Sequence, residues 1–317
     1  MVSTNFNTGR SLFIATRNFA MTLKTHLLLT LIIWVGLIPH AWAAEKAKQQ
    51  EDGAIFEESK IKAEKGDAES QFTLGFMYQE GRGVTGDIDQ SIKWYRKAAE
   101  QGHVESQHNL GLVYANGSGV PKDVAQAMKW WRKAAEQGKA DSQHNLGLAY
   151  ANGHGVPKDE AEAAKWYLKA AEQGMGVSQF NLGFMYDHGH GLPKDVGKAI
   201  KWYRKAAEQG HVGSQHNLGS IYNNAGGVPK DISESIKWYI KAAEQGKASS
   251  QYNLGLIYGV GDGVPKDELK AYKWFLLAGA KNEEFRKAIP IIEKSLTPEQ
   301  RAEGQKLARE FKPVVQK

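Results

Sequence analysis

The architecture follows from a stretch that reads SQHNLGLVYANGSGVPKD at residues 106–123 and SQHNLGLAYANGHGVPKD at residues 142–159. These copies begin 36 residues apart, and the same spacing links six related segments without an insertion. The recurring glutamines are Gln71, Gln107, Gln143, Gln179, Gln215 and Gln251, and the recurring tryptophans are Trp94, Trp130, Trp166, Trp202, Trp238 and Trp274. A fixed period of this length indicates a repeat protein.

Each copy is predicted to contain two helices. In the copy that starts near Val104, residues at spacings of three, one and three make one buried stripe and predict helix A over residues 104–115. Helix B is predicted over residues 124–137, because Asp123 stands at the N-cap position and Gln126 follows three residues later. Pro121 prevents helix A from continuing into helix B.

Glycine marks two places in every copy. Gly138 and its equivalents are predicted to end helix B in the left-handed conformation, and Asn282 takes this place in the last copy. Gly111 and its equivalents lie inside helix A, where glycine costs about 1 kcal/mol relative to alanine. Because this cost recurs in all six copies, we expect helix A to pack closely on helix B there.

The two ends of the array differ from its interior, as capping elements do. We assign residues 54–67 as an N-terminal capping half-repeat, 68–282 as six repeats and 283–317 as C-terminal capping helices. One capping helix is predicted over residues 285–293. Thr297, Pro298 and Gln300 predict the start of another, which ends near Phe311. The polar residues 44–53 are expected to form a flexible linker.

Residues 1–43 have the pattern of a secretory signal peptide. Lys24 precedes an apolar run over residues 27–38, and the small residues Ala41 and Ala43 follow. The run is shorter than the roughly 20 residues that span a bilayer, so we expect cleavage after Ala43 and no membrane span afterwards. Met21 is an alternative start. The processed chain is expected to be exported, to the periplasm or to the extracellular space.

The composition excludes several classes of protein. The 317 residues contain no cysteine, which rules out disulfides, thiolate metal sites and a cysteine nucleophile. The formal net charge of +6 falls to +3 when residues 1–43 are removed, because their only charged side chains are three basic ones. No basic run remains, so a nucleic-acid partner is not expected.

The repeat resembles the Sel1-like repeat, a relative of the tetratricopeptide repeat with a longer loop between its helices. The resemblance rests on the period, on the loop glycines Gly117 and Gly119, and on the motif Lys-Trp-Tyr-x-Lys-Ala-Ala-Glu-Gln-Gly in helix B. It covers residues 54–282. It implies an all-α, right-handed superhelical solenoid of α/α repeats, which serves as a non-enzymatic scaffold for protein–protein interactions, often in the bacterial envelope.

In a stacked solenoid, the side of helix A that faces away from the core lines the concave face. One row on this side is Phe72, His108, His144, Phe180, His216 and Tyr252, and the next is Phe76, Leu112, Leu148, Phe184, Ser220 and Leu256. Such groups on a solvent-facing surface predict a protein-binding groove, with Glu69, Asn109 and Asn145 beside it to fix the register of a partner. The alternatives are that the rows only fill the spaces between copies and that the asparagines make local hydrogen bonds.

The other recurring side chains predict structure rather than chemistry. The tryptophan row is expected to pack in the core. His108, His144 and His216 lie on separate helices, and His154, His188 and His190 form only a weak metal motif. We therefore expect no metal and no other cofactor.

No catalytic residues are predicted, because the sequence contains no zinc-protease, serine-hydrolase or phosphate-loop motif. A secreted virulence or host-contact factor is one alternative function. The other is a protein that binds or hydrolyses β-lactams or peptidoglycan, as described for some secreted relatives of the repeat. Those relatives carry a cysteine pair in each repeat, which this chain lacks. The identity of the protein partner and the oligomeric state stay open.

Overall fold

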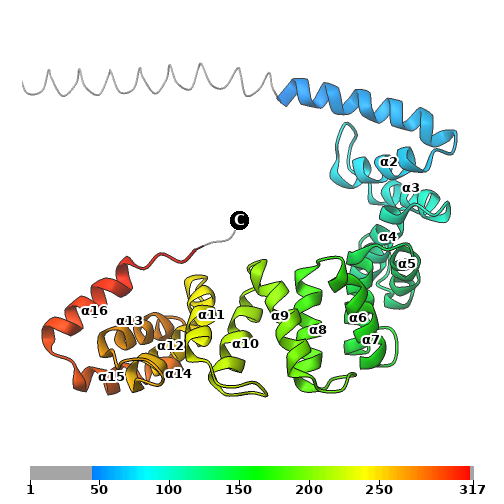
Figure 1. Cartoon of the computed structure of the whole chain (residues 1–317). Helices are drawn as coiled ribbons and strands as arrows, with labels where there is room; N and C mark the ends of the chain where they lie inside the picture. The colour runs from blue at the N-terminus through cyan, green and yellow to red at the C-terminus, as the bar shows by residue number, and fades with distance from the viewer. Residues whose placement is uncertain (1–44, 315–317) are drawn as a thin grey trace, which may run out of the picture. The chain divides into compact units, whose positions relative to one another are not determined.

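The structure is a computed structural model that describes residues 45–314 (Figure 1). Every regular element in this range is a helix, which confirms the all-α prediction. The predicted signal peptide over residues 1–43, with its alternative start at Met21, lies outside the described residues. Among the described helices, none is both long enough and apolar enough to cross a membrane.

Six pairs of helices follow one another, one pair for each predicted repeat. The A helices are α2 (Ala68–Glu80), α4 (Val104–Asn116), α6 (Ala140–Asn152), α8 (Gly176–His188), α10 (Val212–Asn223) and α12 (Ala248–Val260). The B helices are α3 (Ile88–Glu100), α5 (Val124–Glu136), α7 (Glu160–Glu172), α9 (Val196–Glu208), α11 (Ile232–Glu244) and α13 (Glu268–Gly279). For the copy that starts near Val104, both predicted helices are correct to within one residue at each end.

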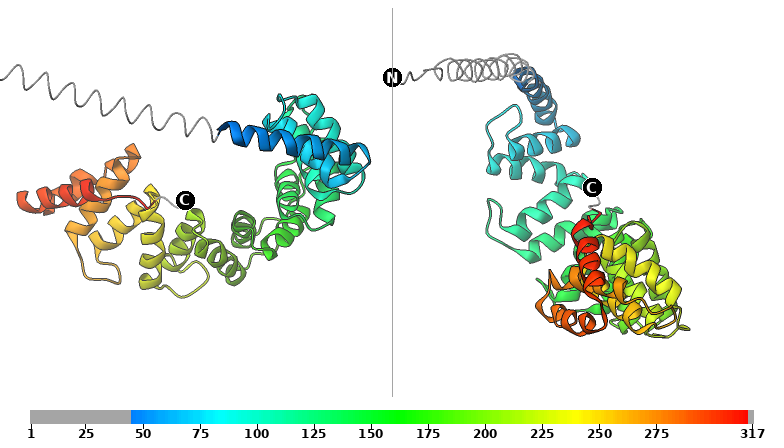
Figure 2. Two further views of the ribbon diagram at one scale, coloured as in Figure 1. Left: turned by 90° about the horizontal axis from the view of Figure 1, so that it is seen from above. Right: turned by 90° about the vertical axis from the view of Figure 1, so that its left-hand side faces the viewer.

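The chain divides into two compact units, which meet between His103 and Val104 in the sequence. The first unit contains a helix over residues 45–64 together with α2 and α3. In the second unit, each B helix contacts the A helix of its own copy, and each except the last, α13, also contacts the A helix of the next copy. The copies of this unit therefore stack in sequence order, as Figure 2 shows from two further directions.

The helix over residues 45–64 covers the first copy. Its Phe56 and Ala63 join the hydrophobic cluster of α2 and α3. The helix includes residues 45–53, where the polar composition predicted a flexible linker. Two physical reasons favour a helix there: the stretch is rich in strong helix formers, and Asp52 bonds to Arg82 in the loop after α2.

The helix ends follow the local signals in the sequence, with one exception. Asp123 accepts a hydrogen bond from the backbone N–H of Gln126 at 2.9 Å, and an aspartate caps each of the other B helices in this way. Gly138 adopts the predicted left-handed conformation, with φ of 97°. The exception is Asn282, whose φ is −146°. Another helix begins at once, and the Asn282 side chain caps it by accepting the N–H of Glu284 at 2.8 Å.

Helix A lies very close to helix B at the mid-helix glycine, as predicted. A Cβ atom placed on Gly219 would lie 2.5 Å from the ring of Tyr239, well inside van der Waals contact. Five of the six recurring tryptophans are at most 7% exposed, as expected for core residues, whereas Trp130 is half-buried. Trp166 packs in one cluster with residues of α5 and α6, so its ring lies between successive copies.

The recurring glutamine of helix A is buried and connects successive copies. The side-chain N–H of Gln143 donates to the carbonyl of Ala135 at 3.0 Å, and its oxygen accepts a hydrogen bond from Gln173 at 2.7 Å. The periodicity predicted the burial of these glutamines but not their partners. We call the series the glutamine ladder. Its members with an accepting bond of this kind are Gln71, Gln107, Gln143, Gln179 and Gln215, bonded to Gln101, Gln137, Gln173, Gln209 and Gln245.

The ladder changes at its last member, Gln251. The side-chain N–H of Gln251 donates to Ala243 at 3.0 Å, as elsewhere. Its oxygen, however, is buried without a hydrogen-bond partner among the described residues. The reason is that Lys281 occupies the place of the second glutamine and donates to the carbonyl of Gly246 at 2.9 Å instead.

Short helices close the C-terminal end of the array: α14 (Glu283–Arg286), α15 (Ile289–Ile292), the 3₁₀ turn η1 (Glu293–Ser295) and α16 (Pro298–Glu310). The single helix predicted over residues 285–293 is therefore divided. Pro290 explains the division, because a proline is tolerated in the first turn of a helix but not in its interior. The capping box at Thr297 and Gln300 is present, as predicted. Phe311 then packs on Trp274, with ring centroids 5.8 Å apart.

Candidate interaction surface

The first predicted row of binding residues is half-buried in the structure. We call it the half-buried row; it consists of Phe72, His108, His144, Phe180, His216 and Tyr252. Its histidines bond through Nδ1 to serine hydroxyls of the next copy, His108 to Ser142 at 2.8 Å, His144 to Ser178 at 2.9 Å and His216 to Ser250 at 2.8 Å. All three serines are fully buried. These histidines therefore take part in the contacts between copies.

Burial lowers the pKa of each of these histidines, and it lowers that of His216 to about 4. The positive charge of Lys247 adds to the effect at His216. The negative charge of Asp141 opposes the effect of burial at His108 and His144, because it raises the pKa of each ring. The His216 ring is therefore neutral at pH 7. Within residues 45–314, no three His, Asp or Glu side chains are close enough together to hold a metal ion.

The aromatic members of the half-buried row make a second kind of contact. Phe72 lies against His103 with ring centroids 4.8 Å apart, and Phe180 lies against His211 at 4.5 Å. Each partner follows 31 residues later in the sequence. Where the row carries histidine, the corresponding positions hold Lys139, Met175 and Lys247. This pairing of residue types was visible in the sequence as a signal that the row packs one copy on the next.

The second predicted row faces solvent. Phe76, in the first unit, is 37% exposed. In the second unit the large side chains are 37–43% exposed, and we call them the exposed row: Leu112, Leu148, Phe184 and Leu256. The half-buried Ser220 interrupts this row between Phe184 and Leu256.

The polar residues predicted beside the rows have different environments. Asn109 and Asn145 are half-buried next to the exposed row. Two further members of the asparagine series, Asn181 and Asn253, hydrogen bond to tyrosines of the preceding B helices. The carboxylate of Glu69 is 3.0 Å from the ring of His103, and its side chain is largely exposed. The asparagines thus combine local bonding with partial access to solvent.

An aromatic stack enlarges the exposed row at α8. The ring of His188 lies 4.1 Å from that of Phe184, and the ring of His190 lies 5.7 Å from it, with nearly parallel planes. The third residue of the weak metal motif, His154, is exposed on the preceding loop. The stack therefore places two histidines beside an apolar ring at the surface.

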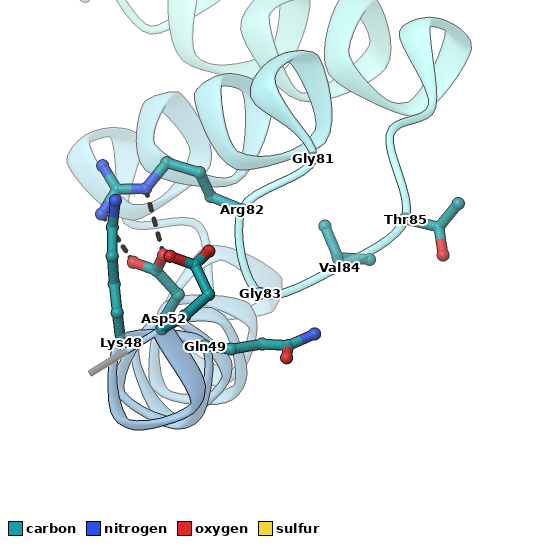
Figure 3. A pocket seen from close by; sticks show the side chains of 9 residues that line it. Lys48, Gln49, Asp52, Gly81, Arg82, Gly83, Val84 and Thr85 are labelled. Carbon is teal, nitrogen blue, oxygen red and sulfur yellow. Dashed lines mark hydrogen bonds and ion pairs between the residues drawn. The ribbon is translucent and has the colours of Figure 1, made fainter. Parts of the chain in front are cut away.

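A polar pocket of about 610 Å³ lies in the first unit, between the helix over residues 45–64 and the loop after α2 (Figure 3). Arg82 of the loop donates two hydrogen bonds to Asp52, and these hold the pKa of that carboxyl below its ordinary value. Lys48 lies beside the pair (Figure 3). Because Asp52 and Arg82 neutralise each other, we assign them the role of fixing the loop to the helix.

Comparison with known proteins relates this arrangement to a family. A family profile described as Sel1 repeat matches six consecutive segments, at residues 68–103, 104–139, 140–175, 176–211, 212–247 and 248–283. The crystal structure of a Sel1 repeat protein from Oxalobacter formigenes is 36% identical, with 67% of this chain and 85% of that chain covered and a TM-score of 0.56. A protective antigen of uropathogenic Escherichia coli strains, described as displaying an SLR fold, is 29% identical, with 80% of this chain and 78% of that chain covered and a TM-score of 0.46.

A search of curated proteins returned no match. The profile, however, covers well over half of the chain, and its segments begin at the first residue of each A helix, from α2 to α12. On this evidence the chain belongs to the Sel1 repeat family.

Proposed function

We propose that this chain is a non-enzymatic scaffold that binds partner proteins through the exposed row. The observation that carries the proposal is the recurrence of a large, solvent-facing apolar side chain at one position of successive A helices, at Leu112, Leu148 and Phe184 and again at Leu256. Single exposed apolar residues are ordinary on protein surfaces, whereas a series on one face is typical of an interaction site.

The free energy that burial of the exposed row contributes to partner binding is modest. Complete burial of a leucine or phenylalanine side chain contributes about 1.5–3 kcal/mol, and roughly two-fifths of each side chain in the row remains to be buried. The four members together therefore contribute about 4 kcal/mol, less than the cost of association under many estimates. Polar contacts must add to this, and we assign that role to the half-buried Asn109 and Asn145.

The binding surface proposed here is narrower than the groove expected from the sequence. His108, His144 and His216 bond to the next copy, and Phe72 and Phe180 pack on histidines. A variant of these residues would weaken the repeat array as well as any groove. The exposed row is the part that can be changed without touching these contacts.

We further propose that the protein acts in the cell envelope, in the periplasm, on the basis of the signal-peptide pattern in residues 1–43. Cell fractionation and N-terminal sequencing test this proposal. A mature chain that begins after Ala43 in the periplasmic fraction is the expected result. Recovery of that chain from the culture medium would favour a host-contact role instead.

Site-specific photocrosslinking in cells tests the binding surface. Benzoylphenylalanine at position 148, on α6, should form an adduct with a partner protein, and the adduct should disappear when Leu112 and Phe184 are changed to asparagine. The same probe at Lys201, an exposed residue of α9 outside the row, is the control. Equal adducts from both positions would contradict the proposal. Turnover of a chromogenic β-lactam by the purified protein would contradict the non-enzymatic assignment.

A further inference from the structure

The last repeat departs from the other five at the end of its A helix. The final residue of α12 is Val260, and the corresponding residues of the earlier copies are all polar: Glu80, Asn116, Asn152, His188 and Asn224. Val260 is also 74% exposed. An apolar side chain thus replaces a polar one at a strongly exposed position. Core packing does not explain the replacement, because the side chain is not in the core.

The C-terminal cap places a second exposed apolar side chain beside this one. Ile291 of α15 is 70% exposed, and it lines a pocket of about 360 Å³ together with Leu256, Val260, Phe275 and Ile292. Leu256 belongs to the exposed row. The pocket is therefore continuous with the surface proposed to bind partners, at its C-terminal end.

A smaller pocket of about 120 Å³ adjoins the first, because Leu256 and Val260 line both. We call the two together the double pocket. Asn223 and Asn253 also line the smaller pocket. The side-chain oxygen of Asn223 is buried without a hydrogen-bond partner among residues 45–314, although the nitrogen of the same group donates to Asn224. A buried acceptor of this kind is stabilised when a ligand supplies an N–H group.

The charges around the double pocket cancel in pairs. Lys266 bonds to Glu268 at 2.6 Å, and Lys287 bonds to Glu284 at 2.7 Å. In the smaller pocket, Asp262 is paired with Lys230 at 2.7 Å. An occupant with a net charge would gain little from this balanced rim. The charge distribution therefore complements an uncharged segment.

We propose that the double pocket binds an extended, uncharged peptide segment of a partner protein, with one large apolar side chain in the larger pocket and an adjacent peptide N–H on Asn223. This inference rests on the proposed function and adds the chemistry of the partner. A second copy of this chain is a poorer occupant, because a stable dimer buries about 800 Å² on each partner, far more than a pocket of side-chain size offers. The orphan carboxamide oxygen favours a peptide group over a purely apolar ligand.

Selection of random linear peptides displayed on phage against the purified protein tests the proposal. The selected peptides should share a large apolar residue flanked by uncharged ones. Val260→Asn restores the residue type of three earlier copies at an exposed position, and it should weaken peptide binding about tenfold, a loss of about 1.4 kcal/mol. Val177→Asn is the matched control and should bind the peptide as the native chain does, because Val177 is a 49% exposed valine of α8 that lies outside both the exposed row and the double pocket. Unchanged thermal midpoints would show that both variants fold.

A second measurement addresses Asn223. N-methylation of the peptide group next to the apolar residue should weaken binding to the native protein but not to the Asn223→Leu variant. Three outcomes would overturn the inference: no peptide is enriched, Val260→Asn binds the peptides as well as the native chain, or the native chain forms a dimer that Val260→Asn abolishes. If the crosslinks from position 148 persist while the peptide tests fail, only this inference is wrong; if both fail, the proposed function is wrong as well.

Discussion

Replacing Lys281 with glutamine should make the protein more stable. In the native chain the Gln251 oxygen is buried without a hydrogen-bond partner among residues 45–314, because Lys281 stands where earlier copies have a glutamine. The preceding copy shows what a glutamine does at this place. Gln245 donates to the Gln215 oxygen at 2.8 Å and to the carbonyl of Gly210 at 3.1 Å. A glutamine at 281 can therefore replace the existing bond to Gly246 and also satisfy Gln251.

The expected magnitude follows from the cost of an unsatisfied buried acceptor, about 1–3 kcal/mol, and from the net value of a hydrogen bond, about 0.5–1.5 kcal/mol. We expect Lys281→Gln to raise the free energy of unfolding by about 1 kcal/mol. The reverse change, Gln245→Lys, removes the partner of the Gln215 oxygen and should lower the free energy of unfolding by about 2 kcal/mol.

Urea unfolding at pH 7 measures both effects. Lys294→Gln is the matched control, since Lys294 is exposed and outside the glutamine ladder; it should change the stability by less than about 0.5 kcal/mol. A Lys281→Gln variant no more stable than the native chain would refute the reasoning. Equal stabilisation by Lys294→Gln would show that loss of a positive charge, not the hydrogen bond, is the cause.

Three further changes have defined outcomes in the same assay. Because burial lowers the pKa of His216 from 6.5 to about 4, its neutral ring contributes stability above pH 6.5 that is lost as the pH falls toward 4. His216→Phe should reduce the loss of stability between pH 7 and pH 5 by about 1 kcal/mol, a value that allows for solvent screening at a half-buried site. If the variant loses as much stability between these pH values as the native chain does, the assignment to His216 is wrong. Gly219→Ala forces a Cβ into the Tyr239 ring and should cost about 2–3 kcal/mol, whereas a neutral effect would show that the helices separate easily. Thr297→Ala removes a helix cap and should cost about 1 kcal/mol, and an equally stable variant would mean that α16 needs no cap.

The parts of the fold that could be predicted from the sequence are those with local causes. An aspartate that caps a helix, a glycine that ends one and a proline that prevents one each act within a few residues, so α4 and α5 were placed almost correctly. The error at Asn282 came from treating the last copy like the others. The helix α14 begins at Glu283, one residue before the position at which a further A helix would begin, so Asn282 caps α14 instead of ending α13 in the left-handed conformation. The helix over residues 45–53 was missed because a polar composition was taken as a sign of flexibility.

The candidate site was harder to predict, because contacts between copies decide which of its residues are covered and which face solvent. Both rows of helix A combine apolar and polar residue types, and the sequence does not say which row the next copy covers. His108 was assigned to a binding groove, yet its partner Ser142 lies 34 residues away on another helix. The double pocket was missed for a similar reason: Val260 and Ile291 line one pocket only because the C-terminal cap returns to the last repeat, where α15 packs on α13.

The contacts between copies also determine how the length of such a chain can change. Gln143 reaches Ala135 across 8 residues and Gln173 across 30, and His144 reaches Ser178 across 34. Each of these separations fits within two adjacent copies. The deletion or duplication of one 36-residue unit therefore leaves every copy next to a neighbour with which it can make the same contacts. A gene that encodes this array can therefore grow or shrink in whole units without inventing a new interface. Such a step alters the number of copies between the N-terminal cap and the double pocket and leaves the chemistry of both in place.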